Sequence, residues 1–229
     1  MTSQNKTLIT IMGPTAIGKT SLSILLAKYF NTEIISCDSR QFFKEMTIGT
    51  AVPSRKELEA AIHHFIQDRS IFEDYNVGSF ERDALQTLEK LFQKHDVVIM
   101  VGGSGLYVQA VLKGLDDFPK VDPSIRVRLN HVLETEGMIS LQQQLKELDL
   151  QTYNTIKLDN PQRVIRALEI CIGTKLPYSS FTGKAKEKRN FNSITVGLHA
   201  DRQKIYNRIN YRVDLMIENG LLEEAKQLY

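Results

Sequence analysis

The residues with the clearest chemical potential lie in the segment GPTAIGKT, residues 13–20. The segment matches G-x-x-x-x-G-K-[ST] in full, between an apolar run and a helical pattern, and a chance match on a glycine turn is the alternative. In such a loop the backbone N–H groups bind a diphosphate, Lys19 neutralises its charge and the Thr20 hydroxyl ligates Mg²⁺. The motif specifies neither a base nor a sugar. The predicted diphosphate-binding residues are Gly13, Pro14, Thr15, Ala16, Ile17, Gly18, Lys19 and Thr20.

Asp38 is an acidic residue that follows a second apolar run, residues 33–37. In a doubly wound sheet ligands bind beyond the carboxyl ends of the strands, so Asp38 is expected to face the same crevice as Lys19. Three roles are open for it: a ligand for Mg²⁺-bound water, a general base, or an Asx turn that ends the strand.

A second glycine segment, residues 102–105, follows the apolar run 97–101 and opens another helical pattern. P-loop proteins that hydrolyse nucleotides usually carry an acidic residue at the end of a second strand, near the Mg²⁺ ion. Here glycines stand at that place, and Val108 replaces the third glycine of a dinucleotide fingerprint. The two glycine segments together suggest a site that is open to two ligands.

Two groups of arginines are candidates for phosphate contacts. Arg163 and Arg166 are neighbours near the start of a predicted helix in DNPQRVIRALEI, although the solvated face of an amphipathic helix would look the same. Arg212 lies at the edge of an apolar stripe in the last long helix, which makes it a candidate diphosphate clamp, with a structural salt bridge as the alternative. The stripe consists of Ile205, Ile209, Val213 and Met216.

Two further groups are given no chemical role. His63 and His64 are adjacent and lack companion ligands, so we expect no zinc site. The basic run KAKEKR, residues 184–189, is interpreted as a solvated loop, with contact to an RNA backbone as the alternative.

Short apolar strands that alternate with helices must position these residues. This alternation indicates a parallel sheet that is covered on both faces. We therefore predict an α/β fold with a P-loop NTPase-like parallel sheet, helices on both faces and an all-helical insertion. The predicted strands are 8–12, 33–37, 97–101 and 194–198, and the predicted helices of the sheet region are 20–29, 80–95, 106–112 and 201–220.

The predicted domain organisation follows from a change of pattern near Asp122, where helices continue without strands. Residues 1–120 form the first part of the α/β core, residues 121–185 form the helical insertion, and residues 186–229 return to the core. Within the insertion, Asp122-Pro123 and Asn160-Pro161 each set an N-cap residue before a proline at the first helical position.

The composition limits the function classes. The 229 residues carry a net charge of only +2, so a nucleic acid must be held by locally clustered Lys and Arg. The two cysteines are far apart in sequence, which argues against a disulfide framework and favours the cytoplasm. The N-terminal apolar run is too short for a signal peptide or a bilayer span, so we expect no membrane association.

Taken together, the motifs resemble those of the tRNA dimethylallyltransferases, also called tRNA isopentenyltransferases. The matching segments occur in the family's order along essentially the whole chain. They are GPTAIGKT, DSRQ, IGTAVP, Phe80 with Asp83-Ala84, VGGSGLY, DNPQRVIRALEI and RINYRVDLMIENGL. Members of this family continue beyond the segment GLLEEAKQLY, so we expect this chain to lack the family's C-terminal portion.

The resemblance implies transfer of a dimethylallyl group from dimethylallyl diphosphate to N6 of the adenosine 3′ of the anticodon in tRNA, with release of diphosphate. Residues 15–20 would hold the diphosphate with Mg²⁺, Asp38 would accept the amine proton, and Lys19 and Arg212 would stabilise the leaving group. The partners would be the tRNA anticodon stem-loop and dimethylallyl diphosphate, and we expect a monomer. The implied tRNA contacts are Asp38, Ser39, Arg40, Gln41, Ser104, Gly105, Arg126, Val127, Gln162, Arg163, Val164, Ile165 and Arg166.

Two other functions stay open on the residues alone. One is a P-loop kinase for a small, nucleoside-like molecule, in which the helical insertion would act as a lid. The other is a non-catalytic RNA-binding or regulatory NTPase module. Both make Asp38 a metal-water ligand. The kinase predicts ATP consumption that depends on a small acceptor, and the module predicts tight nucleotide binding without a covalent RNA product, whereas the transferase needs no nucleotide hydrolysis.

Overall fold

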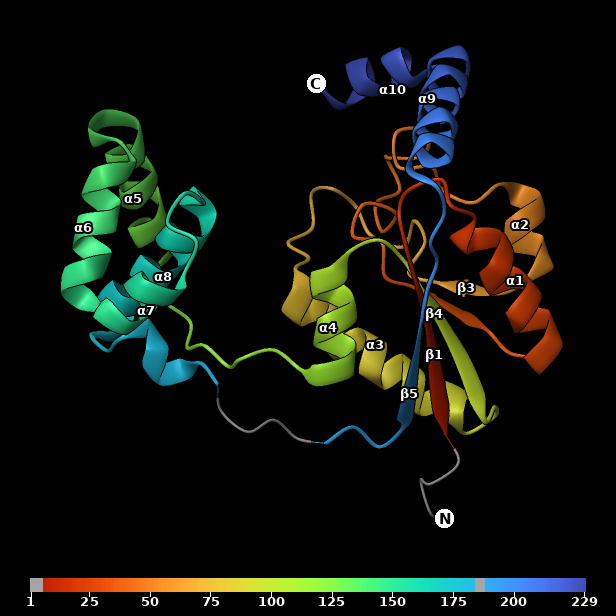
Figure 1. Ribbon diagram of the computed structural model, residues 1–229, viewed down its shortest axis with the longest axis horizontal. Helices are drawn as coiled ribbons and strands as arrows, with labels where there is room; N and C mark the ends of the chain where they lie inside the picture. Colours follow the sequence, from red (N-terminus) through yellow and green to blue (C-terminus); the bar gives the residue numbers. More distant parts are fainter. Residues whose placement is uncertain (1–5, 184–187) are drawn as a thin grey trace. The chain divides into compact units, whose positions relative to one another are not determined.

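The structure, a computed structural model, describes residues 6–183 and 188–229. The chain divides into two compact units, one formed by Met1–Gly114 with Glu187–Tyr229 and the other by Leu115–Lys186. Each unit has an apolar core of its own, so each is described by itself (Figure 1).

The first unit is built on a parallel sheet. Among the described residues it has five strands in the order β3-β2-β4-β1-β5, and every neighbouring pair is parallel. Because the strands are parallel, the loops that follow β1, β2 and β4 meet at one edge of the sheet. The strands are β1 (Thr7–Met12), β2 (Ile34–Ser36), β3 (His63–His64), β4 (Val97–Val101) and β5 (Asn192–Gly197).

Helices cover both faces of this sheet. The side chains of β4 alternate between the faces, so Val98 and Met100 pack in one apolar cluster and Ile99 and Val101 in another. Helices α3 (Val77–Phe92) and α4 (Gly105–Lys113) lie on the first face, and α1 (Lys19–Phe30) and α2 (Arg55–Ala60) on the second (Figure 1). The α/β fold predicted from the sequence is confirmed.

Three elements of the first unit, namely β3, α2 and the helix of residues 221–228, are not among the elements predicted from the sequence. Strand β3 has only two residues, too few for a periodic pattern. Helix α2 has six residues, and its start could have been found from a capping box, because Ser54 and Glu57 each accept a backbone N–H from the other.

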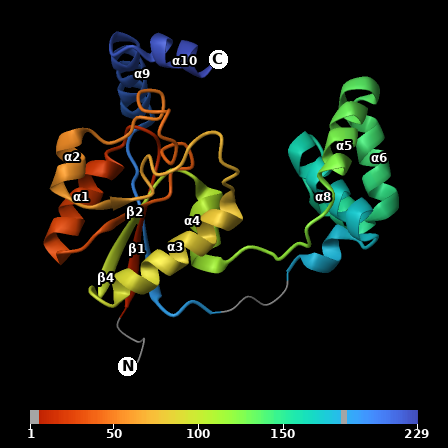
Figure 2. The same ribbon diagram turned by 180° about the vertical axis from the view of Figure 1, so that it is seen from behind.

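Two helices close the first unit at the carboxyl edge of the sheet. Helix α9 (Arg202–Glu218) is capped by Asp201, as predicted, and α10 (Leu221–Leu228) follows after Gly220. Figures 1 and 2 both show α9 and α10 beyond the carboxyl ends of the strands, next to the loops that follow β1 and β2.

In the described part of the second unit, all regular elements are helices. The predicted caps are present, since Asp122 accepts the N–H of Ser124 and Asn160 accepts that of Arg163. Its core contains Leu129, Leu141, Leu145 and Leu168, each at most 1% exposed. The elements are α5 (Pro123–Glu136), α6 (Met138–Leu148), α7 (Leu150–Thr155), α8 (Pro161–Thr174) and the 3₁₀ helix η2 (Tyr178–Phe181).

Candidate active site

The first glycine loop connects β1 to α1. Gly18 directly precedes α1, and its φ of +105° is a left-handed conformation that a side chain would strain. No described side chain caps this end of α1, so its first N–H groups and the positive end of its dipole face the loop. A helix start of this kind binds phosphate groups.

Lys19 begins α1 and reaches back over the loop. Its ammonium group donates to the carbonyl oxygens of Gly13 and Pro14, both at 2.9 Å. Burial lowers the pKa of Lys19, the Asp38 carboxylate opposes this effect, and the Arg212 guanidinium adds to it. An anion bound in the loop would restore the charged form, because an opposite charge nearby favours it.

Asp38 lies two residues beyond the end of β2. Its Oδ1 atom accepts the N–H of Arg40 at 3.1 Å, so the Asx turn considered for this residue is present. Its Oδ2 atom makes no hydrogen bond to a described residue. The turn therefore occupies one carboxylate oxygen and leaves the other available to accept a proton.

The second glycine loop holds the turn that carries Asp38. A β-carbon on Gly102 would lie 2.6 Å from both the carbonyl carbon and Sγ of Cys37, so the close approach at Gly102 is between two strand ends. The Ser104 hydroxyl accepts the N–H of Ser39 at 3.1 Å and donates to the Ser39 hydroxyl at 3.1 Å. Gly103 has open space around it and lines the cavity described below.

Gly102→Ala is expected to lower the free energy of unfolding by about 1–3 kcal/mol, because the backbone of Cys37 leaves no room for a methyl group. Gly103→Ala is the matched control, since no atom lies within 4 Å of the β-carbon that it adds, and it should change stability by less than about 0.5 kcal/mol. Urea unfolding of both variants measures the difference. Equal midpoints would show that the strand ends separate easily.

Arg212 reaches the site from α9, whose inward face differs from the prediction. Ile205, Ile209, Arg212 and Met216 are half-buried, whereas Val213 is 43% exposed. The assignment of Val213 to the buried stripe is therefore wrong, because the inward face follows the spacing 205, 209, 212 and 216. Arg212 lines the cavity and makes no ion pair with a described residue, so the salt-bridge alternative is not observed.

The loop of residues 48–53, IGTAVP, forms one wall of the cavity. In the sequence it was only one of the segments that match the family, with no role of its own. Gly49, Thr50, Ala51 and Pro53 line the cavity. Gln41 holds this loop, because its Nε2 donates to the carbonyl oxygens of Thr50 at 3.1 Å and Ala51 at 2.9 Å. Both N–H groups of the Gln41 carboxamide are therefore used inside the protein.

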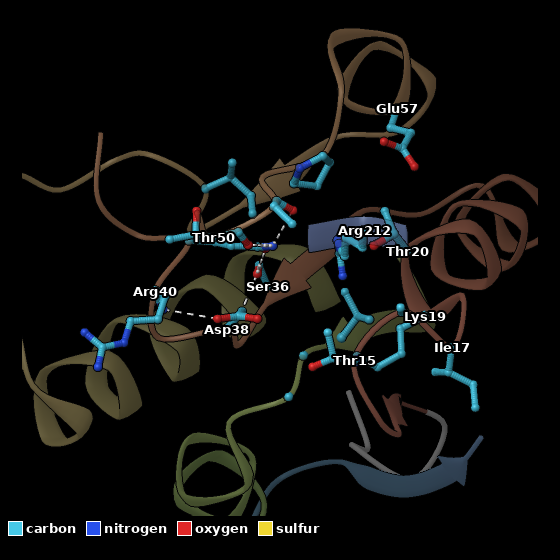
Figure 3. Close-up of a pocket in the computed structure, with 18 of the residues that line it drawn as sticks. Thr15, Ile17, Lys19, Thr20, Ser36, Asp38, Arg40, Thr50, Glu57 and Arg212 are labelled. Atoms are coloured by element: carbon cyan, nitrogen blue, oxygen red, sulfur yellow. Dashed lines mark hydrogen bonds between the residues drawn. The ribbon is translucent and has the colours of Figure 1, made fainter. Parts of the chain in front are cut away.

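These segments enclose a cavity of about 450 Å³ at the carboxyl edge of the sheet. Figure 3 shows Lys19, Thr20, Asp38 and Arg212 around this cavity. Lys19 and Thr20 come from the start of α1, Asp38 from the turn after β2 and Arg212 from α9. A diphosphate held by the first loop would therefore have Arg212 beside it and a carboxylate across the cavity. Glu57 and His63 also line the cavity, and the sequence analysis had assigned them no part in it.

The residues at the first loop fit a Mg²⁺ ion that is bound together with a diphosphate. Mg²⁺ usually keeps several waters and takes one or two protein oxygens besides substrate phosphates. The Thr20 hydroxyl lines the cavity and makes no hydrogen bond to a described residue, so it can serve as such a ligand. Within the described ranges, no group of three or more His, Cys, Asp or Glu residues is arranged to hold a metal by itself.

The helical unit contains a second cavity, of about 540 Å³. Gln162, Arg163 and Arg166 from α8 line it together with Tyr178 and Ser179. Arg163 is exposed, whereas the guanidinium of Arg166 lies 5.5 Å from the centre of the Phe118 ring. Three of the tRNA contacts implied by the resemblance are thus brought together on one surface of this unit.

Other residues of that set are engaged inside the helical unit. Val164 and Ile165 are fully buried, so the prediction that their side chains contact tRNA is wrong. Arg126 forms a bidentate pair with Glu169, at 2.8 and 2.6 Å, while Val127 is 70% exposed. Burial alone would raise the pKa of Glu169, but the bonds from Arg126 keep it below its usual value.

The basic run is only partly a solvated loop. Arg189 donates to the carbonyl oxygens of Ala110 at 2.8 Å and Val111 at 2.9 Å, and it pairs with Glu81 on α3. The prediction is therefore wrong for Arg189, because its side chain binds α4 and α3 just before the chain enters β5. Lys184 and Lys186 lie outside the described residues.

Comparisons with known proteins agree with this geometry. A family model described as IPP transferase matches residues 41–229. The chain is 63% identical to a tRNA dimethylallyltransferase from Christiangramia forsetii over 222 residues, which cover 97% of this chain and 74% of the relative. It is 58% identical to a tRNA dimethylallyltransferase from Flavobacterium johnsoniae, with 98% of this chain and 74% of that protein covered. The chain thus spans about three quarters of the length of these relatives.

Solved structures lead to the same group of proteins. A tRNA isopentenylpyrophosphate transferase from Bacillus halodurans has a TM-score of 0.66 at 36% identity, with 99% of this chain and 70% of that chain covered. A eukaryotic dimethylallyltransferase described as acting on tRNA has a TM-score of 0.81 at 29% identity, with 98% of this chain and 56% of that chain covered. Among the helices of residues 6–183 and 188–229, none combines the length and the apolar composition of a membrane-spanning segment. With its glycine loop, its cavity carboxylate and these relatives, the chain belongs to the IPP transferase family, the family of the tRNA dimethylallyltransferases.

Proposed function

We propose that this protein transfers a dimethylallyl group from dimethylallyl diphosphate to N6 of the adenosine 3′ of the anticodon in tRNA, and releases diphosphate. The observation that carries the proposal is that Lys19, Thr20, Asp38 and Arg212 surround one cavity. Alkyl transfer to an amine needs a cradle for the leaving diphosphate and a base for the amine proton, and this cavity has candidates for both. Relatives named tRNA dimethylallyltransferases support the choice of substrates.

The residues divide the chemistry between two walls of the cavity. A bond forms between N6 of adenine and C1 of the dimethylallyl group while the bond from C1 to the diphosphate oxygen breaks. Asp38 accepts the proton that N6 loses, and Lys19 and Arg212 stabilise the negative charge that develops on the diphosphate. A Mg²⁺ ion bound to Thr20 and the diphosphate would neutralise further charge on the leaving group. Alignment of the amine and the allylic carbon between these walls lowers the remaining barrier.

The adenosine must leave its stack to reach Asp38, because a stacked base hides the amine. We assign Ser39, Arg40, Ser104 and Gly105 to the surface that receives it. Arg40 lines the cavity, and the hydrogen bonds between Ser39 and Ser104 hold their two loops together next to Asp38. These contacts support an entrance formed by the turn after β2 and the loop after β4.

We assign the tRNA contact of the helical insertion, residues 121–185, to Gln162, Arg163 and Arg166, together with the exposed Val127. The first three side chains line one cavity, and the exposed Arg163 can bind a phosphate without regard to sequence, whereas Arg166 also pairs with Glu169 at 3.4 Å. Arg126 supports this surface from within through its pair with Glu169. The transfer reaction would then take place in the unit formed by residues 1–120 and 186–229, and the insertion would contribute to the affinity for tRNA.

Arg163→Ala is expected to weaken tRNA binding and to reduce the slope of log affinity against log salt by about 1, because one phosphate contact is lost. Transfer at saturating tRNA should be unchanged. Lys146→Ala is the matched control, since it removes one positive charge from an exposed position on α6. Titrations of an anticodon stem-loop at several salt concentrations measure the slope. An unchanged slope would show that Arg163 makes no phosphate contact and that this face of α8 is only solvated surface.

Radiolabelled dimethylallyl diphosphate, Mg²⁺ and unmodified tRNA test the function directly. Label in the RNA is the expected result, and ATP consumption that depends on a small acceptor, without labelled RNA, would favour the kinase alternative instead. The comparisons do not favour that alternative.

We further propose that the protein acts in the cytoplasm as a monomer. Its two cysteines are free and buried, which supports a reducing compartment, and sedimentation tests the monomer.

A further inference from the structure

Helix α10 carries an acidic side chain that binds three consecutive backbone amides of a distant loop. The Oε2 atom of Glu224 accepts the N–H groups of Thr47 at 2.9 Å and Ile48 at 2.7 Å, and its Oε1 atom accepts that of Gly49 at 2.8 Å. Successive N–H groups that converge on one anion form a nest. Although burial raises the pKa of Glu224, these donors lower it overall, so the side chain is charged at neutral pH.

The loop that Glu224 holds is also a wall of the active-site cavity. Gly49, Thr50 and Ala51 line the cavity, and Gln41 binds the carbonyl oxygens of the last two from the side of Asp38. The loop is thus fixed through its N–H groups by α10 and through its C=O groups by the turn after β2. Ala51 has a φ of +51°, a conformation that a non-glycine residue keeps only when its surroundings enforce it.

The packing of α10 against this loop is close. A β-carbon on Gly49 would lie 3.1 Å from Cδ1 of Leu221 and 3.3 Å from Oε1 of Glu224. The neighbouring Glu223 behaves differently, because it pairs with Lys226 on its own helix and both side chains are 65% exposed. The position of Glu224, rather than the acidity of the helix, therefore accounts for the contact.

We propose that Glu224 is a positioning residue for the transfer reaction, which holds the 47–51 loop in the shape that the substrate cavity requires. The inference rests on the proposed function for its kinetic part only. Glu224 touches no reacting atom, so it acts through the loop. Loss of its carboxylate frees three N–H groups at once and lets this wall of the cavity move.

Glu224→Ala is expected to lower kcat/KM for transfer roughly 10- to 100-fold, the range that a small displacement of a positioned group can cause. Formate should restore much of the loss, because its carboxylate fits the three amides that the variant leaves without a partner. Glu224→Gln should keep only part of the rate, since its carboxamide oxygen can accept the N–H groups of Thr47 and Ile48 but its NH₂ group would face the N–H of Gly49. Glu223→Ala is the matched control on the same helix and should behave like the unsubstituted protein.

Hydrogen exchange at Thr47, Ile48 and Gly49 supplies a readout that does not depend on turnover. These amides should exchange faster in Glu224→Ala and slow again with formate. Unchanged exchange, or faster exchange with unchanged kcat/KM and unchanged affinity for dimethylallyl diphosphate, would overturn the inference. Absence of transfer by the unsubstituted protein would instead overturn the proposed function, and exchange and calorimetric affinity would still decide whether Glu224 shapes the cavity.

Discussion

Asp38→Asn is expected to lower kcat by about 10²- to 10⁴-fold, the usual contribution of a positioned general base, with little change in the affinity for dimethylallyl diphosphate. The carboxamide keeps the shape of the side chain, and its oxygen can still accept the N–H of Arg40 that fixes the turn. What it loses is the ability of Oδ2 to take the proton from N6. Single-turnover transfer at saturating tRNA, with calorimetry for the diphosphate, separates the two quantities.

Asp74→Asn is a suitable control for this experiment, because it removes one carboxylate from an exposed position in the same unit. The result for Asp38→Asn also distinguishes between the functions considered for this chain. Normal transfer by Asp38→Asn would remove the general-base assignment. A loss of affinity for the Mg²⁺-diphosphate without a separate loss of turnover would make Asp38 a ligand for metal-bound water, as the kinase alternative requires.

Arg212→Ala is the second large effect, with an expected fall in kcat/KM for dimethylallyl diphosphate of about 10²- to 10³-fold. Arg212 lines the cavity and lies near enough to Lys19 to lower the pKa of its ammonium group, so both cations act on the same part of the cavity. Charge that develops on a leaving diphosphate is stabilised most by donors that are already in place. Arg212→Lys should recover only part of the rate, because an ammonium group cannot bind two phosphate oxygens in the planar geometry of a guanidinium.

Arg202→Ala is the matched control for this experiment. Arg202 lies on the same helix and is exposed, and its guanidinium donates to the Tyr206 hydroxyl at 2.8 Å and lies over the Tyr206 ring. Product inhibition by diphosphate offers a second measurement, since Arg212→Ala should raise the inhibition constant. If both the rate and the inhibition constant stayed at the values of the unsubstituted protein, Arg212 would have no part in binding the leaving group.

Features that depend on neighbouring residues were predictable from the sequence. Gly13–Thr20 was recognised as a strand–loop–helix segment because its glycines, lysine and flanking patterns lie within two dozen residues. The caps at Asp122, Asn160 and Asp201 were found for the same reason, since each bonds N–H groups two or three residues ahead. Parallel sheet topology followed from the alternation of apolar strands with helices, which holds over the whole first unit.

Features that depend on which helix face turns inward were less predictable. The sequence pattern named Arg212 as a candidate at the edge of the apolar stripe but wrongly placed Val213 within the stripe. A cavity accepts a half-buried charged side chain at a position where an apolar core would exclude one. The pattern also could not reveal that Arg189 donates to the carbonyl oxygens of Ala110 and Val111 and pairs with Glu81. All three partners are more than 70 residues away along the chain. In both cases the partners come from other elements.

The sequence by itself therefore determined the α/β fold, the glycine loop before the first helix and the acidic residue after the second strand, because their signals are local in the chain. Tertiary structure alone decided that the loop of residues 49–53, Glu57 and His63 line the cavity together with Lys19, Asp38 and Arg212. It also decided that Gln41 and Glu224 hold the 47–51 loop between them, the second from 175 residues away at Gly49. Contacts of such separation leave no periodic pattern, since they depend on how packed elements bring distant backbone and side-chain groups together.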